Sequence, residues 1–187
     1  QNAKDGDTIT VMNNVSVSDK ITVSNGQSIT LDLNGHDVSF DFKKHIQIQH
    51  GNLNIVGKGC LYEKEPYFSP IILYGSATDQ ANYSVVTVGK NVILKGWAGL
   101  FIDNNNAAGN YGIVANVYGT LQGQKDTSGD GGSALYVNGS IKNTIGNVPK
   151  ITLDGAVLNN EAGTGIYLAG YADTTMKNCT VTSSSEG

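Results

Sequence analysis

The chain contains no arginine. Its 12 basic residues are all lysine, and they stand against 16 acidic residues, which gives a formal net charge of −4. A protein that binds nucleic acid or an anionic membrane surface needs an excess of positive charge, because it must neutralise phosphates. We therefore expect neither nucleic acid nor an anionic membrane surface as a partner.

Long apolar runs are also missing. No stretch approaches the roughly 18 apolar residues that a transmembrane helix requires, so no membrane insertion is expected. Proline is scarce, with 3 residues, whereas glycine is abundant, with 24. Hydrophobic residues make up 39% of the chain and charged residues 15%. This is enough apolar material for a folded domain and too little charge for a disordered chain.

One six-residue pattern occurs six times along the chain. Its second and fourth positions are always aliphatic, and its sixth position is Gly, Asn or His. The copies are residues 20–25, 45–50, 70–75, 99–104, 134–139 and 165–170. Alternation of this kind predicts a strand with one buried face. The start-to-start spacings of 25, 25, 29, 35 and 31 residues predict stacked structural repeats.

Each copy is followed by two more short β-forming stretches that end in Gly or Asn. After 134–139, for example, come 150–155 and 156–160. Three short strands per repeat predict the triangular rung of a parallel β-helix, in one all-β domain of about six to seven rungs that spans residues 1–187. A β-sandwich is the competing interpretation, but it explains neither the in-register copies nor three strands per repeat. Both ends look uncapped, so we expect the chain to be a piece of a longer protein.

Four stretches of the chain, 3–11, 29–36, 118–121 and 165–172, resemble a known family. They are similar to rungs of right-handed parallel β-helix (pectin-lyase-like) modules of bacterial secreted and surface proteins, which also occur in bacteriophage virion proteins. The resemblance covers most of the chain. It implies a right-handed solenoid and an extracellular location. The protein would then be secreted, attached to the cell surface or part of a virion. The resemblance implies little about activity, because one fold hosts many functions.

Enzymes of this fold carry residues that the chain lacks. Many β-helix polysaccharide lyases use an arginine as the base or as a clamp for the uronate carboxylate, a task that suits the forked guanidinium donors. The polygalacturonase-type hydrolases carry Asn-Thr-Asp, paired-Asp, Gly-His-Gly and Arg-Ile-Lys motifs, and the sequence has none of them. We therefore expect no lyase or polygalacturonase site within these residues.

Neither the cysteines nor the histidines predict a metal or catalytic site. Cys60 and Cys179 fall four rungs apart, about 19 Å at a rung spacing of about 4.8 Å, and are predicted to be free thiols. His36, His45 and His50 are predicted to be corner residues, since no Ser, Cys or paired carboxylate lies at a catalytic spacing from them. The Asp- and Gly-rich stretch at 126–132 lacks the ligand order of a calcium loop, so no metal or other cofactor is expected.

The side chains at positions three and five of the pattern point outward if positions two and four point inward. We call them the outer stripe. Position three is Thr22, Gln47, Ile72, Phe101, Tyr136 and Tyr167, and position five is Ser24, Gln49, Tyr74, Asp103, Asn138 and Ala169. The later copies thus place aromatic rings outside, beside Asp and Asn, as is typical of surfaces that stack on sugar rings.

Long connections also occur in the later repeats, at 75–83, 104–111, 122–133 and 140–148. Ligand sites tend to be built where such connections gather on one side of a rigid scaffold. We predict a glycan-binding surface whose candidate residues are Tyr74, Phe101, Asp103, Tyr136, Asn138 and Tyr167. Phe101, Tyr136 and Tyr167 should then be at least partly exposed to solvent.

Two other interpretations of the outer stripe stay open. The long connections or a neighbouring subunit could bury it. A hydrolase would instead need a second carboxylate about 5 Å or about 6.5–9.5 Å from Asp103. Asp126, Asp130 and Glu161 are the candidates for that second carboxylate.

We therefore expect a non-catalytic extracellular module with an adhesive or structural role on a bacterial surface or a phage particle. A glycan is its candidate ligand. Its other candidate partners are further copies of the chain and other surface or virion proteins. The alternative is a truncated β-helix glycoside hydrolase that acts on host or plant glycans.

Overall fold

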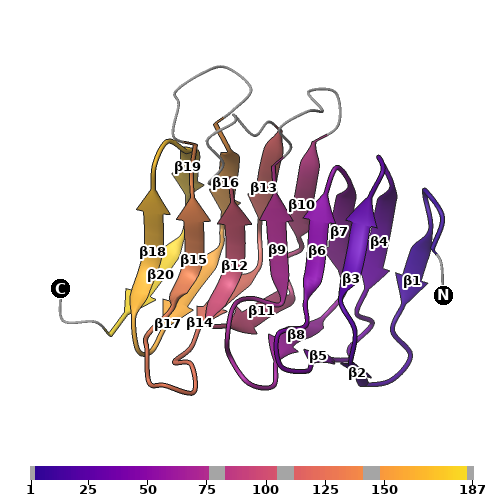
Figure 1. The fold of residues 1–187 in the computed structure, drawn as a ribbon, viewed down its shortest axis with the longest axis horizontal. Coiled ribbons are helices and arrows are strands. Elements are labelled where there is room, and N and C mark those ends of the chain that lie inside the picture. Colours follow the sequence, from indigo (N-terminus) through magenta and orange to yellow (C-terminus); the bar gives the residue numbers. More distant parts are fainter. Residues whose placement is uncertain (1–2, 76–82, 105–111, 141–147, 185–187) are drawn as a thin grey trace.

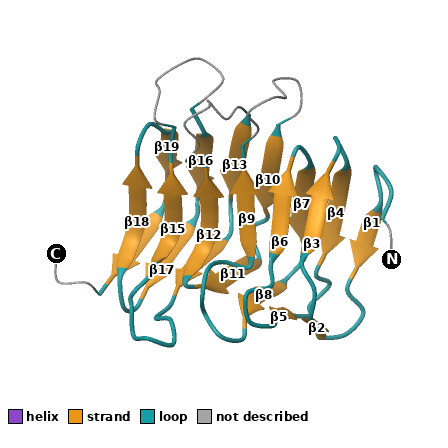
Figure 2. Ribbon diagram, in the orientation of Figure 1, coloured by secondary structure: helices purple, strands orange, loops and turns teal. Residues whose placement is uncertain are grey.

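The computed structural model describes residues 3–75, 83–104, 112–140 and 148–184, and the regular structure of these ranges consists of strands alone (Figure 2). The strands form three sheets, A, B and C, in which every strand pairs with its neighbours in parallel. The chain passes through the three sheets in turn, so each rung adds one strand to each sheet (Figure 1). The predicted right-handed parallel β-helix is confirmed, with six complete rungs and a seventh that has strands in sheets A and B.

The strand bounds follow the rungs. Sheet A contains β1 (Thr8–Thr10), β4 (Ser28–Asp32), β7 (Asn52–Val56), β10 (Ser84–Val88), β13 (Ile113–Val117), β16 (Lys150–Asp154) and β19 (Asp173–Lys177). Sheet B contains β2 (Val15–Val17), β5 (Val38–Phe40), β8 (Gly59–Glu63), β11 (Val92–Gly96), β14 (Thr120–Gly123), β17 (Val157–Asn160) and β20 (Thr180–Ser183). Sheet C contains β3 (Ile21–Ser24), β6 (Ile46–Gln49), β9 (Ile71–Tyr74), β12 (Ala98–Asp103), β15 (Ser133–Asn138) and β18 (Thr164–Ala169).

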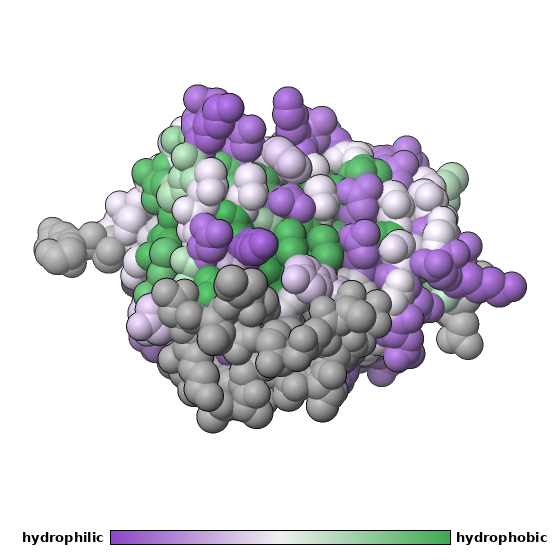
Figure 3. Space-filling model, turned by 90° about the horizontal axis from the view of Figure 1, so that it is seen from above, coloured by the Kyte–Doolittle hydropathy of each residue, from purple (hydrophilic) through white to green (hydrophobic). Residues whose placement is uncertain are grey.

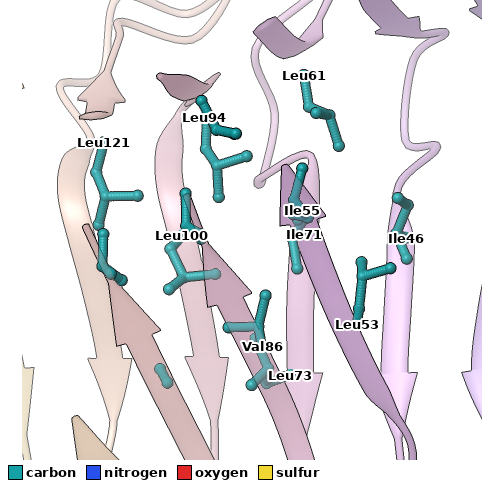
Figure 4. Close-up of a cluster of buried hydrophobic side chains, with 14 of the residues drawn as sticks. Ile46, Leu53, Ile55, Leu61, Ile71, Leu73, Val86, Leu94, Leu100 and Leu121 are labelled. Carbon is teal, nitrogen blue, oxygen red and sulfur yellow. The ribbon is translucent and has the colours of Figure 1, made fainter. Parts of the chain in front are cut away.

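The six copies of the sequence pattern form sheet C, and their aliphatic positions fill the core as two columns. Figure 4 shows Ile46, Ile71, Leu73 and Leu100 of these columns among the buried side chains. The first column is Ile21, Ile46, Ile71, Leu100, Leu135 and Ile166, and the second is Val23, Ile48, Leu73, Ile102, Val137 and Leu168. Members in the middle rungs are fully buried, whereas Ile21 in the first rung is 41% exposed and Leu168 in the sixth is 48% exposed. The columns are therefore continuous, but their burial weakens at the ends.

The corners after the sheet C strands differ with the length of the connection that follows. Asn25, His50 and Gly170 have φ values of 56°, 57° and 76°, and each leads directly into the next strand of sheet A. A residue in the left-handed backbone conformation makes this sharp corner. This conformation costs Gly little, and Asn and His tolerate it. Gly75, Asn104 and Gly139 begin longer connections and have no such φ, so the left-handed corner after a sheet C strand occurs only where the connection is tight.

The two end rungs expose apolar side chains. At the N-terminal rung, Ile9, Met12 and Val15 are 44%, 68% and 43% exposed, and an apolar cavity of about 400 Å³ opens between the three sheets. At the other end Met176 and Val181 are also exposed. Hydrophobic residues accordingly gather at the left, C-terminal end of the molecule in Figure 3.

The cysteines lie four rungs apart, and His45 and His50 lie at corners, as the sequence predicts. Cys60 lies in β8 and Cys179 directly precedes β20, and both are free thiols, as predicted. Burial raises the pKa of Cys60 to about 11, which keeps this thiol protonated and unreactive at neutral pH. His45 and His50 flank β6 at its two corners.

Candidate functional site

The outer stripe is aligned across sheet C as the sequence predicts. Strand pairing places Phe101 between Ile72 and Tyr136, and Tyr136 beside Tyr167. It also places Asp103 between Tyr74 and Asn138. All six candidate residues therefore lie on one face, in two neighbouring columns with one residue per rung.

Aromatic rings form a continuous line across this face, and we call it the aromatic line. Its members are Phe42, Tyr67, Phe68, Phe101, Tyr136 and Tyr167, and each ring contacts the next with centroids 5.1, 4.6, 6.2, 4.9 and 4.5 Å apart. Trp97 joins it from the side, 5.2 Å from Tyr136. Phe42, Tyr67, Phe68 and Trp97 come from the connections between sheets B and C, so only half of the line belongs to the outer stripe.

Phe101 is buried, contrary to the expectation that it is partly exposed. Only 8% of its surface reaches solvent, because Phe68 from the β8–β9 connection stacks over it with an interplanar angle of 25°. Ile72 beside it is 1% exposed. These residues and Ala98 form a second apolar cluster outside the main core, against which Tyr74, Trp97 and Tyr136 pack. A connection thus covers the middle of the outer stripe.

Glu63 anchors the connection that covers Phe101. Its carboxylate is 3% exposed and accepts hydrogen bonds from the backbone N–H groups of Tyr67, at 3.1 Å, and Phe68, at 3.1 and 3.2 Å. Gly96 leaves the room for this carboxylate, since a Cβ there would lie 2.9 Å from Glu63 Oε2. Burial raises the pKa of Glu63, against the opposing effect of the backbone N–H groups.

Glu63 was missed in the sequence, although a signal for it exists. Leu61 faces the core, so Glu63 two residues later must face the same side of β8. A carboxylate at an inward position needs hydrogen-bond donors in the interior. The pattern could therefore have predicted that Glu63 binds a buried backbone segment. It could not have predicted which segment.

Tyr136 and Tyr167 stack on each other at the C-terminal part of the line. Their planes differ by 21°, and Tyr167 is 41% exposed whereas Tyr136 is half-buried. Burial raises the pKa of Tyr136, and so do the Tyr167 hydroxyl, to which it hydrogen-bonds, and the charge of Asp103. Because the two rings use their faces on each other, the pair offers ring edges and the outer face of Tyr167 to a ligand.

A column of polar side chains lies beside the rings, at the C-terminal ends of three sheet C strands. Tyr74, Asp103 and Asn138 are the last residues of β9, β12 and β15, and all three are half-buried. Burial, and then the charge of Asp103, raise the pKa of Tyr74. The column thus offers a carboxylate, an amide and hydroxyls, which are the groups that hydrogen-bond to sugar hydroxyls.

The sequence suggested that the long connections gather on one side, but they do not all join the same ends of the sheet C strands. The connections at 75–83, 104–111 and 140–148 follow the sheet C strands, and most of their residues (76–82, 105–111 and 141–147) lie outside the described ranges. The connection at 122–133 joins β14 to β15 and therefore precedes sheet C. In Figure 1 this connection lies at the lower ends of the sheet C strands.

The three candidate carboxylate partners of Asp103 lie at these lower ends of the strands. Asp126 and Asp130 precede β15, and Glu161 precedes β18. Asp103 pairs with Asn138, five residues beyond Ser133 at the start of β15, which corresponds to about 16 Å along the strand. The start of β15, which Asp126 and Asp130 precede, is thus farther from Asp103 than the about 5–9.5 Å that separates the two carboxylates in glycoside hydrolysis. Asp126 instead accepts hydrogen bonds from Ser128 and from the Asp130 N–H, so it shapes its own turn.

The described ranges contain no group of three or more His, Cys, Asp and Glu side chains that could hold a metal ion. They also contain no helix that is long and apolar enough to cross a membrane.

Comparison of the chain with protein-family models, with curated proteins and with solved structures gives no match. The family resemblance therefore rests on the sequence motifs and on the parallel β-helix itself.

Proposed function

We propose that the chain is a non-catalytic β-helix module that contacts carbohydrate through the outer face of sheet C. The observation that carries the proposal is the aromatic line, whose two ends are open: Phe42, Tyr67 and Phe68 are 43%, 36% and 38% exposed, and Tyr167 is 41% exposed. Sugar rings present apolar C–H faces that pack on such rings, and the column of Tyr74, Asp103 and Asn138 beside them supplies hydrogen-bond partners.

The architecture supports a binding role more than a catalytic one. The candidate residues sit on strands of one rigid sheet, so they are held in place before a ligand arrives. The three carboxylates that the sequence offered for hydrolysis precede sheet C strands, whereas Asp103 is the last residue of one. The proposal includes an extracellular setting, with an adhesive or structural role on a bacterial surface or a phage particle, as the family resemblance implies.

Binding to a glycan array, followed by titration of the best ligand, tests this proposal. Tyr167→Ala should weaken that binding about tenfold while it leaves the melting temperature nearly unchanged, because an exposed ring contributes little to the core. Tyr62→Ala is the matched control, since Tyr62 lies on the outer face of sheet B, away from the aromatic line. An array without any specific ligand, or equal losses for the two variants, would count against the proposal.

A further inference from the structure

The N-terminal end of the aromatic line has a composition of its own. Phe42 and Tyr67 meet edge to face at 5.1 Å, and Phe68 follows Tyr67 at 4.6 Å. Lys43 places its Nζ 4.9 Å from the Phe42 ring centroid and 4.5 Å from that of Tyr67. We call these four residues the aromatic corner, and all four are exposed.

Lys43 adopts a backbone conformation that its residue type disfavours. Its φ is 61°, and the other four non-glycine residues with positive φ in the described ranges are Asn25, Asn34, His50 and Asn178. Asn and His are enriched in this region, whereas a long side chain such as Lys there costs roughly 1–2 kcal/mol. A residue kept in a costly conformation at an exposed position points to a role other than stability.

The ammonium of Lys43 is available to a ligand. In the described part of the chain it rests on two rings and on no carboxylate, whereas the nearby Lys64 is paired with Asp41 at 2.6 Å. Two aromatic faces take up only one side of the ammonium, which has three N–H donors in all. The remaining donors therefore face solvent above an apolar surface.

The surroundings of the corner favour an anion. Burial, and then the positive charges of Lys20 and Lys44, lower the pKa of His45, which directly follows this turn. On the β5–β6 and β8–β9 connections, Glu65 is the acidic residue outside the Lys64–Asp41 pair. Glu63, at the end of β8, is buried, and its carboxylate already accepts the N–H groups of Tyr67 and Phe68. The side chains of these two connections outside that pair, Lys43, Lys44 and Glu65, thus carry a positive charge in sum, on a chain whose net charge is −4.

We infer that the aromatic corner is a subsite for a sugar ring that carries a sulfate ester. This inference rests on the proposed carbohydrate contact and adds a ligand class and four residues to it. The apolar face of the sugar packs on the exposed rings, and the sulfate accepts hydrogen bonds from Lys43 Nζ. A single ammonium suits the tetrahedral sulfate, whereas a planar carboxylate is matched best by the guanidinium fork, and the chain has no arginine.

Titration calorimetry with three tetrasaccharide probes tests the inference: a sulfated galactan fragment, its desulfated parent and an oligogalacturonate. The unaltered chain should bind the sulfated probe about tenfold more tightly than the desulfated one, the value of one charge-assisted hydrogen bond, and the difference should shrink with added salt. Lys43→Asn should abolish the difference and leave the melting temperature unchanged or higher, because Asn suits the left-handed backbone. Lys90→Gln, an exposed lysine on a different corner, is the control and should retain the difference.

Each other outcome overturns the inference. Equal affinity for the sulfated and desulfated probes would show that Lys43 does not bind the sulfate. Tighter binding of the oligogalacturonate would show that the subsite prefers a carboxylate to a sulfate ester. Failure of the sulfated probe to bind also rejects the subsite, whatever the glycan array shows. The proposed function is decided separately by the array and by Tyr167→Ala.

Discussion

At the scale of single residues, Glu63 decides how much of the outer stripe is accessible. Its buried carboxylate holds the N–H groups of Tyr67 and Phe68, and Phe68 in turn covers Phe101. The side chain thus links an inward position of sheet B to the surface of sheet C. Glu63 is buried and its partners are backbone N–H groups, not charged side chains. Among the carboxyl groups in the described ranges, its ionisation should therefore affect folding most.

The pH dependence of stability should reveal Glu63. Because burial raises its pKa, the folded chain binds this proton more tightly than the unfolded chain does. The free energy of unfolding is therefore highest at pH values below 4.5, the ordinary pKa of this carboxyl. It declines as the pH rises from there through the raised pKa of Glu63. Glu63→Gln, which stays neutral and keeps an acceptor oxygen, should lack this decline in urea unfolding between about pH 4 and pH 8.

Glu65→Gln is the matched control for that experiment, because Glu65 is exposed on the same connection. It should keep the decline seen in the unaltered chain. Parallel pH profiles for the unaltered chain and Glu63→Gln would contradict the assignment.

Truncation of Phe101 should destabilise the chain far more than truncation of Tyr167, although the two residues occupy equivalent positions of the sequence pattern. Phe101→Ala opens a cavity beneath Phe68 and should lower the free energy of unfolding by about 3 kcal/mol or more. Tyr167→Ala should lower it by less than about 1 kcal/mol, since that ring is 41% exposed. Urea unfolding of both variants measures this, and similar losses would mean that the β8–β9 connection does not cover Phe101.

Asp103 separates binding from hydrolysis. Asp103→Asn keeps the shape and one acceptor oxygen of the side chain, so a binding surface should tolerate it with a change in affinity of a few fold. Turnover of the array ligand by the unaltered chain, abolished in this variant, would instead establish a hydrolase. Product analysis by mass spectrometry after long incubation distinguishes the two results.

At the scale of strands and connections, the sequence predicted the sheets well and the connections poorly. The strands of sheet C follow from strict alternation and turn residues, both of which act within a few residues. Their register follows as well, because a slip by one residue would turn Ile71 and Leu73 outward. The cover over Phe101 could not be predicted in this way, since it depends on a contact between Glu63 and a segment that turns back on it.

The candidate site shows the same division between local and non-local effects. The alignment of Tyr74, Asp103 and Asn138 was predictable, because it needs only the register of neighbouring rungs. The separation of Asp103 from Asp126 was missed, although the sequence holds it: 122–133 precedes a copy of the pattern, whereas Asp103 lies near the end of one. The aromatic corner was missed because Phe42 and Lys43 lie outside the six-residue pattern.

At the scale of the whole molecule, the rungs stabilise one another in series. Each rung contacts only its neighbours, so damage in the middle should spread further than damage at an end. Leu100→Asn places an amide in the fully buried part of a core column and should lower the free energy of unfolding by at least about 3 kcal/mol. Ile21→Asn, at the 41% exposed end of the same column, should cost much less.

Hydrogen exchange of the backbone amides measures how far the damage spreads. Leu100→Asn should reduce protection in β9, β12 and β15 together, whereas Ile21→Asn should affect β3 and β6 alone. Uniform loss of protection in both variants would show that the rungs unfold as a single unit.

The three outer faces of the solenoid differ, and this difference offers the most direct test of the carbohydrate contact. The central outer column of sheet A is Thr8, Thr30, Asn54, Thr87, Asn116, Thr152 and Thr175, which is polar throughout, whereas sheet C carries the aromatic line. Chemical-shift mapping by NMR, with the best glycan ligand added to the labelled chain, reports which face responds. We predict that the shifts concentrate on Phe68, Tyr136 and Tyr167, whereas shifts that concentrate on the outer columns of sheet A or sheet B would contradict the account.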